Sequence, residues 1–249
     1  MRRAGAMAVP VSMKTAAREV APLRRGPYLW VLATTGAAFT VLAAFAHRWP
    51  ILPFDLEITQ AVQGVHAAWF HSLLRPLNVL GFPPVVDIVY GSVTILVFLR
   101  GRRWAAASCA FSGIGTAALN FITKAIVARP RPPMELVHVQ HQITNSTFPT
   151  GHVLNFTSFA GFLAYLALAR LAPSWRRTAL VTMLAVAIAL MGVARVDSGE
   201  HWTSDVLGGY LLGSLWLAAT IWFYRWGERR SVMPARHDDP RSSDRSRAG

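Results

Sequence analysis

Six long stretches that are almost free of charge constrain this chain more than any other feature. Each is close to the roughly 20 residues that a helix needs to cross a hydrocarbon layer about 30 Å thick. Across the whole chain 53% of residues are apolar and only 15% are charged, against about 25% charged in soluble domains. The sequence therefore predicts an all-α integral membrane protein, a six-helix transmembrane bundle with spans at 28–46, 82–99, 104–123, 152–169, 178–194 and 203–224.

The second stretch, 82–99, is the weakest of the six. Pro83, Pro84 and Asp87 lie near its start, so a buried core helix or a re-entrant segment is the alternative to a full span. Before it, residues 51–80 mix apolar side chains with charged ones and with His66 and His71. This pattern indicates an amphipathic helix lying at the membrane interface, with the two histidines on its polar face.

The basic residues predict the orientation of the bundle. The chain has a formal net charge of +13, and 19 of its 25 Lys and Arg residues fall in 1–27, 100–103, 170–177 and 225–249. Cytoplasmic segments accumulate such residues, so both termini are predicted to be cytoplasmic. Orientation and anionic membrane lipids then explain the basic excess without a nucleic-acid partner. The single cysteine, Cys109, excludes an intrachain disulfide.

The two ends of the chain lack a long apolar stretch. No such stretch precedes residue 28, so the first span is expected to anchor the chain rather than to be a cleaved signal peptide. Residues 1–27 hold six basic residues, and residues 226–249 are polar and rich in Arg and Ser. We expect both to be disordered cytoplasmic tails around a membrane domain at 28–225.

The remaining basic residues gather at span ends on the opposite, outer face. Lys124 ends the third predicted span, and Arg131 follows among prolines that stop the helix. Thr150, Gly151 and His152 open the fourth span. Thr150 is placed to cap that helix, and the free amides of a first helical turn bind anions.

A third cluster lies between the last two spans and contains Arg195, His201 and Asp205. Side chains four residues apart share one face of a helix, so Asp205 can hold one imidazole nitrogen of His201 as N–H and leave the other free as a nucleophile. With spans that alternate in direction, all three clusters reach the same outer face.

Three cations, a helix N-terminus and two histidines suit the transfer of a phosphoryl group. The equatorial oxygens of phosphorus need Lys, Arg and amide donors, and the attacking and leaving atoms must lie in line. His201 is placed to attack phosphorus and His152 to protonate the departing oxygen, which gives a covalent phosphohistidine. Cations around the histidines would also repel a metal ion.

The three clusters resemble the motifs of the type-2 phosphatidic acid phosphatase superfamily, which shares its site with vanadium haloperoxidases. Lys124 through Arg131-Pro132 is similar to Lys-x6-Arg-Pro, 149–152 to Pro-Ser-Gly-His, and Arg195-x5-His201-x3-Asp205 to Ser-Arg-x5-His-x3-Asp. The resemblance implies a lipid phosphate phosphatase that needs no metal or other cofactor. It implies catalytic roles for His201, His152 and Asp205, and phosphate binding by Lys124, Arg131, Arg195, Thr150 and Gly151.

Two positions depart from the family pattern. Thr150 stands where Ser is usual and keeps the hydroxyl, whereas Ala194 replaces a Ser and is expected to remove a hydroxyl from the phosphate pocket. We expect hydrolysis of a lipid phosphate or pyrophosphate monoester at the outer face, with polyprenyl pyrophosphate (undecaprenyl pyrophosphate among them) or phosphatidic acid favoured over phosphatidylglycerophosphate. The alternatives are a lipid phosphotransferase and a non-catalytic lipid-phosphate binding or transport protein. Six spans disfavour a soluble haloperoxidase.

Other polar residues near the motifs receive simpler interpretations. Arg129, Glu135, His138 and His141 are expected to form a solvated loop, the alternative being that they touch the substrate. Asp197 and Glu200 are expected to be exposed at the rim because they would repel phosphate. Residues 145–147 match a glycosylation sequon, to which we assign no role. Gly209 and Gly213 have the four-residue spacing that suits close helix packing.

Overall fold

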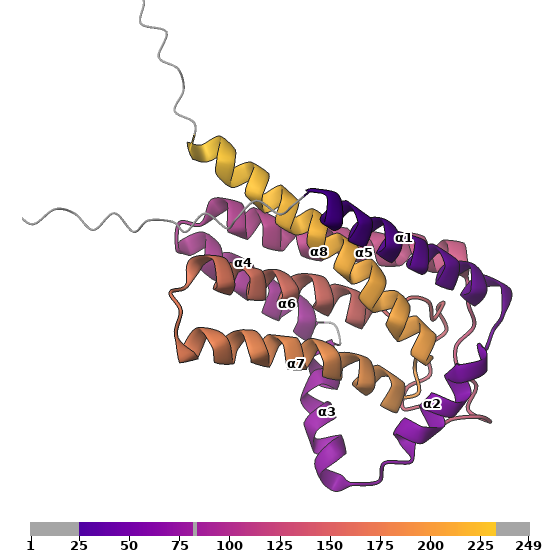
Figure 1. Ribbon diagram of the computed structural model, residues 1–249. Coiled ribbons are helices and arrows are strands. Elements are labelled where there is room, and N and C mark those ends of the chain that lie inside the picture. Colours follow the sequence, from indigo (N-terminus) through magenta and orange to yellow (C-terminus); the bar gives the residue numbers. More distant parts are fainter. Residues whose placement is uncertain (1–24, 82–83, 233–249) are drawn as a thin grey trace, which may run out of the picture.

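The computed structural model describes residues 25–81 and 84–232, and all regular secondary structure in that part of the chain is helical (Figure 1). The prediction of an all-α protein is therefore confirmed. The helices are α1 (Arg25–Arg48), α2 (Pro53–Gln63), α3 (Ala68–Gly81), α4 (Val85–Leu99), α5 (Arg103–Val127), α6 (Gly151–Arg170), α7 (Trp175–Asp197) and α8 (Thr203–Val232).

Five of these helices, α1, α5, α6, α7 and α8, are long and apolar enough to cross a membrane. The second predicted span is shorter than expected, because α4 has only 15 residues. It passes the same test together with α3, from which it is bent by 73°. The count of six spans holds when α3 and α4 are taken as one bent span. Of the two prolines expected to weaken this stretch, Pro84 is the N-cap residue of α4, and Pro83 lies outside the described residues.

The segment predicted as one amphipathic helix, 51–80, consists of two helices. The chain leaves the helical path at 64–67, and α2 and α3 diverge from there (Figure 1). Helix α3 packs on α7, and its Leu74 and Leu77 are buried in a core cluster with Val206 of α8. Apolar side chains that were expected to face lipid thus form part of the protein core, and the position at the membrane interface stays a prediction.

The last helix is longer than its apolar stretch predicted. Helix α8 has 30 residues and ends at Val232, whereas the predicted span ends at residue 224 and the disordered tail was expected from residue 226. Residues 226–232, which were expected to be disordered, are thus helical. The reason is that Arg and Glu favour helix outside a membrane as well. The rest of the two predicted tails, 1–24 and 233–249, lies outside the described residues.

Local sequence explains where several helices begin and end. Ser174 precedes α7, and its Oγ accepts a hydrogen bond of 3.3 Å from the backbone N–H of Arg177, as expected of an N-cap. Pro53 starts α2, and Asp55 accepts a hydrogen bond of 3.0 Å from the N–H of Leu52. Helix α5 ends where Ala128 adopts a left-handed conformation with φ of +48°, two residues before Pro130.

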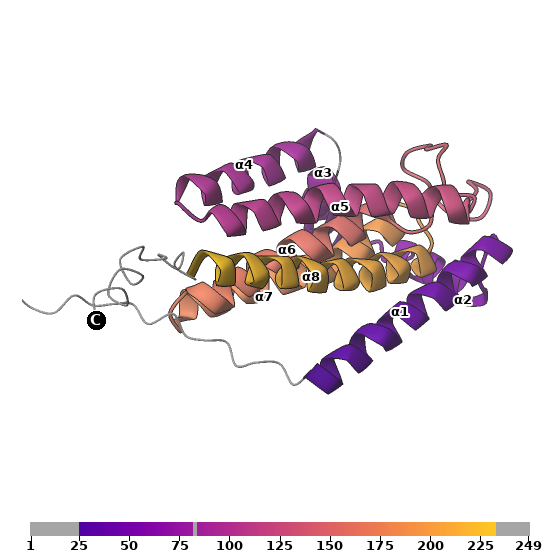
Figure 2. The ribbon, with the colours of Figure 1, turned by 90° about the horizontal axis from the view of Figure 1, so that it is seen from above.

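Helix α6 is the centre of the bundle. It is the most buried of the five long helices and packs against α5, α7 and α8 (Figure 2). A Cβ atom on Gly209 or Gly213 of α8 would lie within 3.0 Å of atoms of α6, which confirms the predicted close packing at these glycines. By contrast only 6% of the α1 span is buried inside the protein, as expected of a helix that faces lipid.

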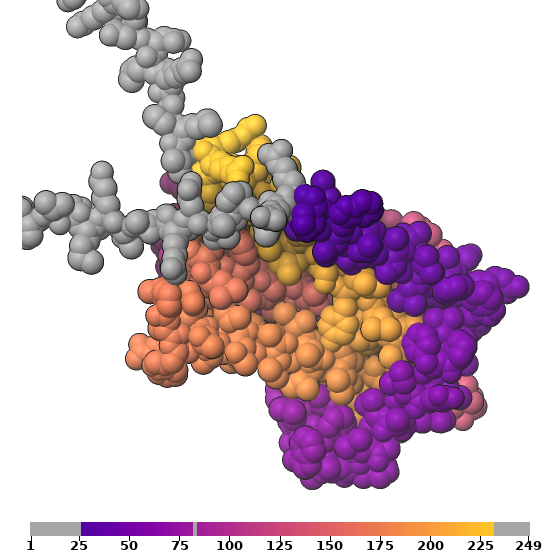
Figure 3. Space-filling view, in the orientation of Figure 1, coloured from indigo at the N-terminus to yellow at the C-terminus, as the bar shows by residue number. Residues whose placement is uncertain are grey.

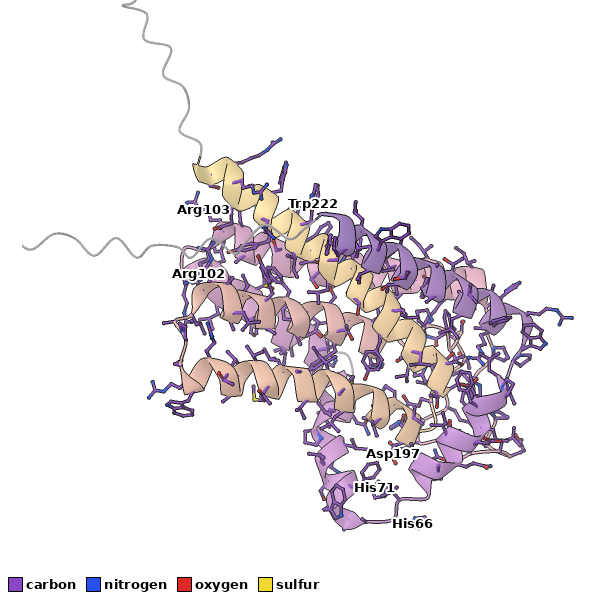
Figure 4. The ribbon with its side chains drawn as sticks, viewed as in Figure 1. His66, His71, Arg102, Arg103, Asp197 and Trp222 are labelled. Atoms are coloured by element: carbon purple, nitrogen blue, oxygen red, sulfur yellow. The ribbon has the colours of Figure 1, made fainter. Side chains whose placement is uncertain are left out.

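The three motif clusters meet at one end of the bundle. The end of α5, the starts of α6 and α8 and the end of α7 lie together there, next to α2 and α3, which form a projecting base in the space-filling view (Figure 3). The basic residues Arg102 and Arg103 lie at the other end, away from Asp197 (Figure 4). The bundle thus separates its strongly basic loops from its motif clusters.

Candidate active site

A cavity of about 380 Å³ lies between α3, α4, α5 and α6 at the motif end of the bundle. Five of the eight residues predicted for the site line it, namely Lys124, Arg131, Gly151, His152 and His201. These residues come from α5, the loop 128–150, α6 and the loop between α7 and α8. The structure therefore brings together side chains that are up to 77 positions apart in the sequence (from Lys124 to His201).

Lys124 and Arg131 are held by neutral acceptors. The Lys124 Nζ donates to the backbone oxygen of Ser146 at 2.6 Å, and Arg131 Nη1 donates to the backbone oxygen of Glu200 at 2.7 Å. Both side chains also reach Oδ1 of Asn145, at 3.5 Å and 2.6 Å respectively. Since none of these partners is a carboxylate, both cations face the cavity with their charge unneutralised by direct contact, as anion binding requires.

Arg195, the third predicted cation, lies behind the cavity lining. It is fully buried, its Nη1 lies 3.2 Å from a carboxylate oxygen of Glu200, and its Nη2 donates to the side chain of Asn78 on α3. The other carboxylate oxygen of Glu200 lies 2.8 Å from Nδ1 of His141. Glu200 is thus 1% exposed and not a rim residue as predicted, because Arg195 compensates the charge that was expected to repel phosphate.

Asp197 was also predicted to be exposed, and this too is wrong. Only 6% of the residue is exposed, and its carboxylate lies 3.5 Å from Nδ1 of His71, across from α7 to α3 (Figure 4). His71 therefore contacts the bundle, whereas His66 lies in the exposed connection between α2 and α3. The reason is that α3 folds against α7 rather than lying separately.

Thr150 is at the N-cap position of α6, as predicted, but its hydroxyl caps nothing. The side chain makes no hydrogen bond to the helix, and the buried Oγ1 has no partner among the described residues. Its backbone N–H instead donates to the backbone oxygen of Asp205 at 3.1 Å. This bond ties the start of α6 to the start of α8.

His152 lies where α3 ends. A Cβ atom on Gly81 would be 2.2 Å from Cδ2 of His152, so only glycine fits at this position, and the histidine ring is hydrogen-bonded to the backbone of Gly81. The predicted general acid is therefore oriented by the end of α3, an element that the sequence motifs do not include.

His201 does not pair with Asp205 as directly as the four-residue spacing predicted. Its Nδ1 lies 3.8 Å from Oδ2 of Asp205, beyond hydrogen-bond reach, and 3.0 Å from Oγ1 of Thr147. The same hydroxyl donates to Oδ2 of Asp205 at 2.7 Å. The four-residue spacing correctly predicted that the two side chains lie near each other. Because α8 begins at Thr203, His201 lies just outside the helix, and the spacing expected within a helix does not apply to it.

Burial and neighbouring charges act on the titration of the loop residues. Burial lowers the pKa of His201 to about 4 and outweighs the nearby negative charge of Asp205, which raises it, while the positive charge of Arg131 lowers it further. Burial also lowers the pKa of the Arg131 guanidinium, and the carboxylates of Glu200 and Asp205 oppose this. His201 is therefore neutral at physiological pH, the form that a nucleophile needs.

Asp205 is enclosed by hydrogen-bond donors. Arg129 Nη1 donates to its Oδ1 at 2.6 Å, and the backbone N–H of Trp202 donates to its Oδ2 at 2.8 Å. Arg129 also donates through Nη2 to Oδ2 of Asp55 at 2.7 Å. The hydroxyl of Ser204 accepts a hydrogen bond from Arg129 and donates one to Asp55. The prediction that Arg129 belongs to a solvated loop is wrong, since the residue is 1% exposed and joins α2 to the start of α8.

Ala194 does not line the cavity. Ala194 is fully buried in the apolar cluster that contains Met191 and Val206, and it is not among the residues that line the cavity. The position at which a phosphate-binding hydroxyl was expected to be lost therefore belongs to the apolar core and not to the cavity wall.

Three residues of the site were not found from the sequence: Asp55, Arg129 and Thr147. Arg129 is two residues from Arg131, and its basic character was a signal, but nothing in the sequence paired it with a carboxylate on α2. Thr147 stands just before Phe148-Pro149 and was treated as part of a sequon. Among the described residues no three His, Cys, Asp or Glu side chains are grouped as a metal site would need.

Comparison with known proteins relates most of the chain to a phosphatase. Phosphatidylglycerophosphatase B of Bacillus subtilis (strain 168) is 28% identical over 184 residues, which are 71% of this chain and 86% of the relative.

Two solved structures share the fold. The crystal structure of a transmembrane PAP2-type phosphatidylglycerolphosphate phosphatase from Bacillus subtilis superposes with a TM-score of 0.68 at 22% identity, over 82% of this chain and 98% of the other. That of Aquifex aeolicus LpxE gives a TM-score of 0.56 at 18% identity, over 68% and 96%. The sequence model of the PAP2 superfamily matches residues 103–229. That range contains every motif residue around the cavity, and the chain is a multi-pass membrane protein that belongs to the PAP2 superfamily of phosphatases.

Proposed function

We propose that the protein hydrolyses a lipid phosphate or pyrophosphate monoester and releases inorganic phosphate through a phosphohistidine. One observation carries the proposal: a cavity into which two cations with neutral partners and two histidines project. A bound phosphate group would be the negatively charged partner that Lys124 and Arg131 do not have within the protein. The apolar helices around the cavity suit a substrate that enters sideways from lipid.

The residues support a two-step reaction. The free Nε2 of His201 attacks phosphorus, the bond from phosphorus to the lipid oxygen breaks, and His152 gives its proton to that oxygen. Water then attacks the phosphohistidine, with His152 taking the proton of the water. Lys124, Arg131 and the amides at Gly151 stabilise the charge on the phosphoryl oxygens in both steps, with Arg195 behind them. No step in this proposal requires a metal ion.

The substrate and the side of the membrane are part of the proposal. The Bacillus relative is named for phosphatidylglycerophosphate, so this lipid joins phosphatidic acid and polyprenyl pyrophosphate as a candidate. Since the basic loops 100–103 and 170–177 lie at the end of the bundle away from the cavity, the positive-inside rule places the cavity at the outer face and both termini in the cytoplasm.

Phosphate release from the three lipids in detergent, with a chelator present, tests this function. His201→Ala is expected to lower turnover by roughly 10³-fold or more, because the nucleophile is lost. His66→Ala is the matched control, since it removes an exposed histidine outside the cavity, and it should keep wild-type turnover. Equal turnover in His201→Ala and wild type would refute the histidine mechanism, and loss of activity with chelator would refute metal independence.

The two alternatives predict different products. A phosphotransferase would move phosphate to an added lipid or alcohol acceptor, which product analysis by mass spectrometry detects. A binding or transport protein would retain labelled lipid phosphate without release. The Ala194 substitution that motivated this second alternative lies in the apolar core, so hydrolysis is the function that the geometry supports best.

A further inference from the structure

We propose that Thr147 is a positioning residue that carries the hydrogen bond between His201 and Asp205. The two catalytic side chains do not touch: Nδ1 of His201 and Oδ2 of Asp205 are 3.8 Å apart. The Thr147 hydroxyl lies between them, 3.0 Å from the first and 2.7 Å from the second. The inference rests on the proposed function and adds to it a residue outside the three motifs.

The direction of both hydrogen bonds follows from the chemistry of the groups. An ionised carboxylate only accepts, so the hydroxyl proton of Thr147 points to Asp205. The backbone oxygen of Glu200, at 3.5 Å, is a much poorer acceptor for this proton. The hydroxyl oxygen is then left to accept, which requires the proton of the neutral His201 ring to be on Nδ1. Nε2 is consequently unprotonated and able to attack phosphorus.

The hydroxyl is fixed in place by its surroundings. Thr147, His201 and Asp205 are at most 2% exposed, so water does not compete for these bonds. The backbone N–H of Thr147 donates to the backbone oxygen of Arg129 at 3.0 Å, and Arg129 in turn bonds the other oxygen of Asp205. Threonine, carboxylate and guanidinium therefore form one rigid unit behind the imidazole.

The relay determines which nitrogen reacts. With Nδ1 occupied by its bond to Thr147, the new bond to phosphorus forms at Nε2 alone. The ring becomes positively charged when it is phosphorylated, and its Nδ1–H bond to Thr147 then strengthens because the hydroxyl is polarised by Asp205. Phosphorylation at Nε2 and kcat, rather than substrate binding, should depend on the hydroxyl.

Thr147→Val and Thr147→Ser test the relay by steady-state kinetics. Valine keeps the shape and removes the hydroxyl, so kcat is expected to fall by about 10²-fold with KM changed by less than about threefold, since loss of the correct tautomer costs up to about 10⁴-fold in a serine protease. Serine restores the hydroxyl and should recover kcat to within about fivefold of wild type. Thr220→Val removes a buried hydroxyl that bonds only its own helix and should leave kcat unchanged.

A second measurement is made on the wild-type protein and does not depend on activity. Nitrogen-15 NMR of the imidazole in the wild-type protein at pH 7 should show the proton of His201 on Nδ1, with His201→Gln for assignment. A proton on Nε2, or a Thr147→Val protein with wild-type kcat, would overturn the relay. Wild-type protein that releases no phosphate but has the proton on Nδ1 would refute the proposed function and keep the relay.

Discussion

Two arginines that are two residues apart belong to different regions of the site and have opposite surroundings. Arg131 lines the cavity and bonds only neutral oxygens, from Asn145 and Glu200. Arg129 is buried behind the cavity and bonds the carboxylates of Asp55 and Asp205. The comparison teaches that charge alone does not identify a binding residue: the cation available to a ligand is the one that the protein leaves without a carboxylate.

The two regions also differ in what their loss would cost. In the buried region two carboxylates share one guanidinium, and removing it leaves two charges without compensation in a place without water. In the cavity wall the partners of Arg131 are neutral oxygens, and one of them belongs to the exposed Asn145. We therefore expect Arg129 to matter for folding and Arg131 for substrate. Two substitutions test this division, and a titration of the neighbouring His201 adds a third test of the buried region.

The largest effect is expected from Arg129→Met. The substitution keeps most of the volume but leaves Asp55 and Asp205 facing each other, so the free energy of unfolding should fall by about 3 to 5 kcal/mol. Thermal unfolding in detergent measures the change. Arg75→Met, which removes an exposed arginine of α3, is the control and should leave Tm nearly unchanged. An Arg129→Met protein as stable as the control would show that the buried network contributes little.

Arg131→Met should affect turnover far more than stability. Loss of a cavity-facing cation is expected to lower kcat/KM by about 10²-fold, because the phosphoryl charge is less stabilised in the transition state, while Tm changes by only a few degrees. The measurement is phosphate release together with thermal unfolding of the same preparation. If Arg131→Met unfolded as readily as Arg129→Met, the division between a structural and a ligand-binding arginine would fail.

The smallest effect concerns the proton of His201. Because burial lowers its pKa to about 4, the folded protein keeps this ring neutral while an unfolded chain, with an ordinary value near 6.5, takes up a proton. Stability contributed by this group is therefore full above pH 6.5 and decreases as the pH falls toward 4. A nitrogen-15 titration of the ring should have its midpoint near pH 4. A midpoint at 6 or above would mean that Asp205 or solvent reaches the ring directly.

Much of the fold was predictable from the chain, and for a plain physical reason. A helix that crosses a membrane needs about 20 apolar residues, and this requirement is visible in the sequence for α1, α5, α6, α7 and α8. Pro83, Pro84 and Asp87 indicated that the second predicted span is unusual, but not that α3 and α4 form one bent span. The length of α8 was not predictable, because beyond residue 224 its residues are polar and a helix outside the apolar layer has no hydrophobic signature.

The candidate site was predictable only as far as local spacing reaches. Spacing placed Lys124, Arg131, His152 and His201 at one end of the bundle, and the structure brings them to one cavity. Spacing could not reveal the partners of Arg129 or Glu200. Asp55 lies 74 positions from Arg129 in the sequence, and a sequence does not distinguish a buried charge from an exposed one. Nor could spacing distinguish a direct His201–Asp205 bond from one through Thr147, because that difference is about one ångström.

The left-handed residue at the end of α5 has a consequence for how this protein can vary. Ala128 turns the backbone so that Arg129 is buried and Arg131 reaches the cavity, with the exposed Pro130 between them. The distance in residues from the end of α5 thus determines which arginine is buried and which one reaches the cavity. Inserting or deleting a single residue here would move one guanidinium out of the interior and the other away from the ligand, so this loop should accept changes of side chain far more readily than changes of length.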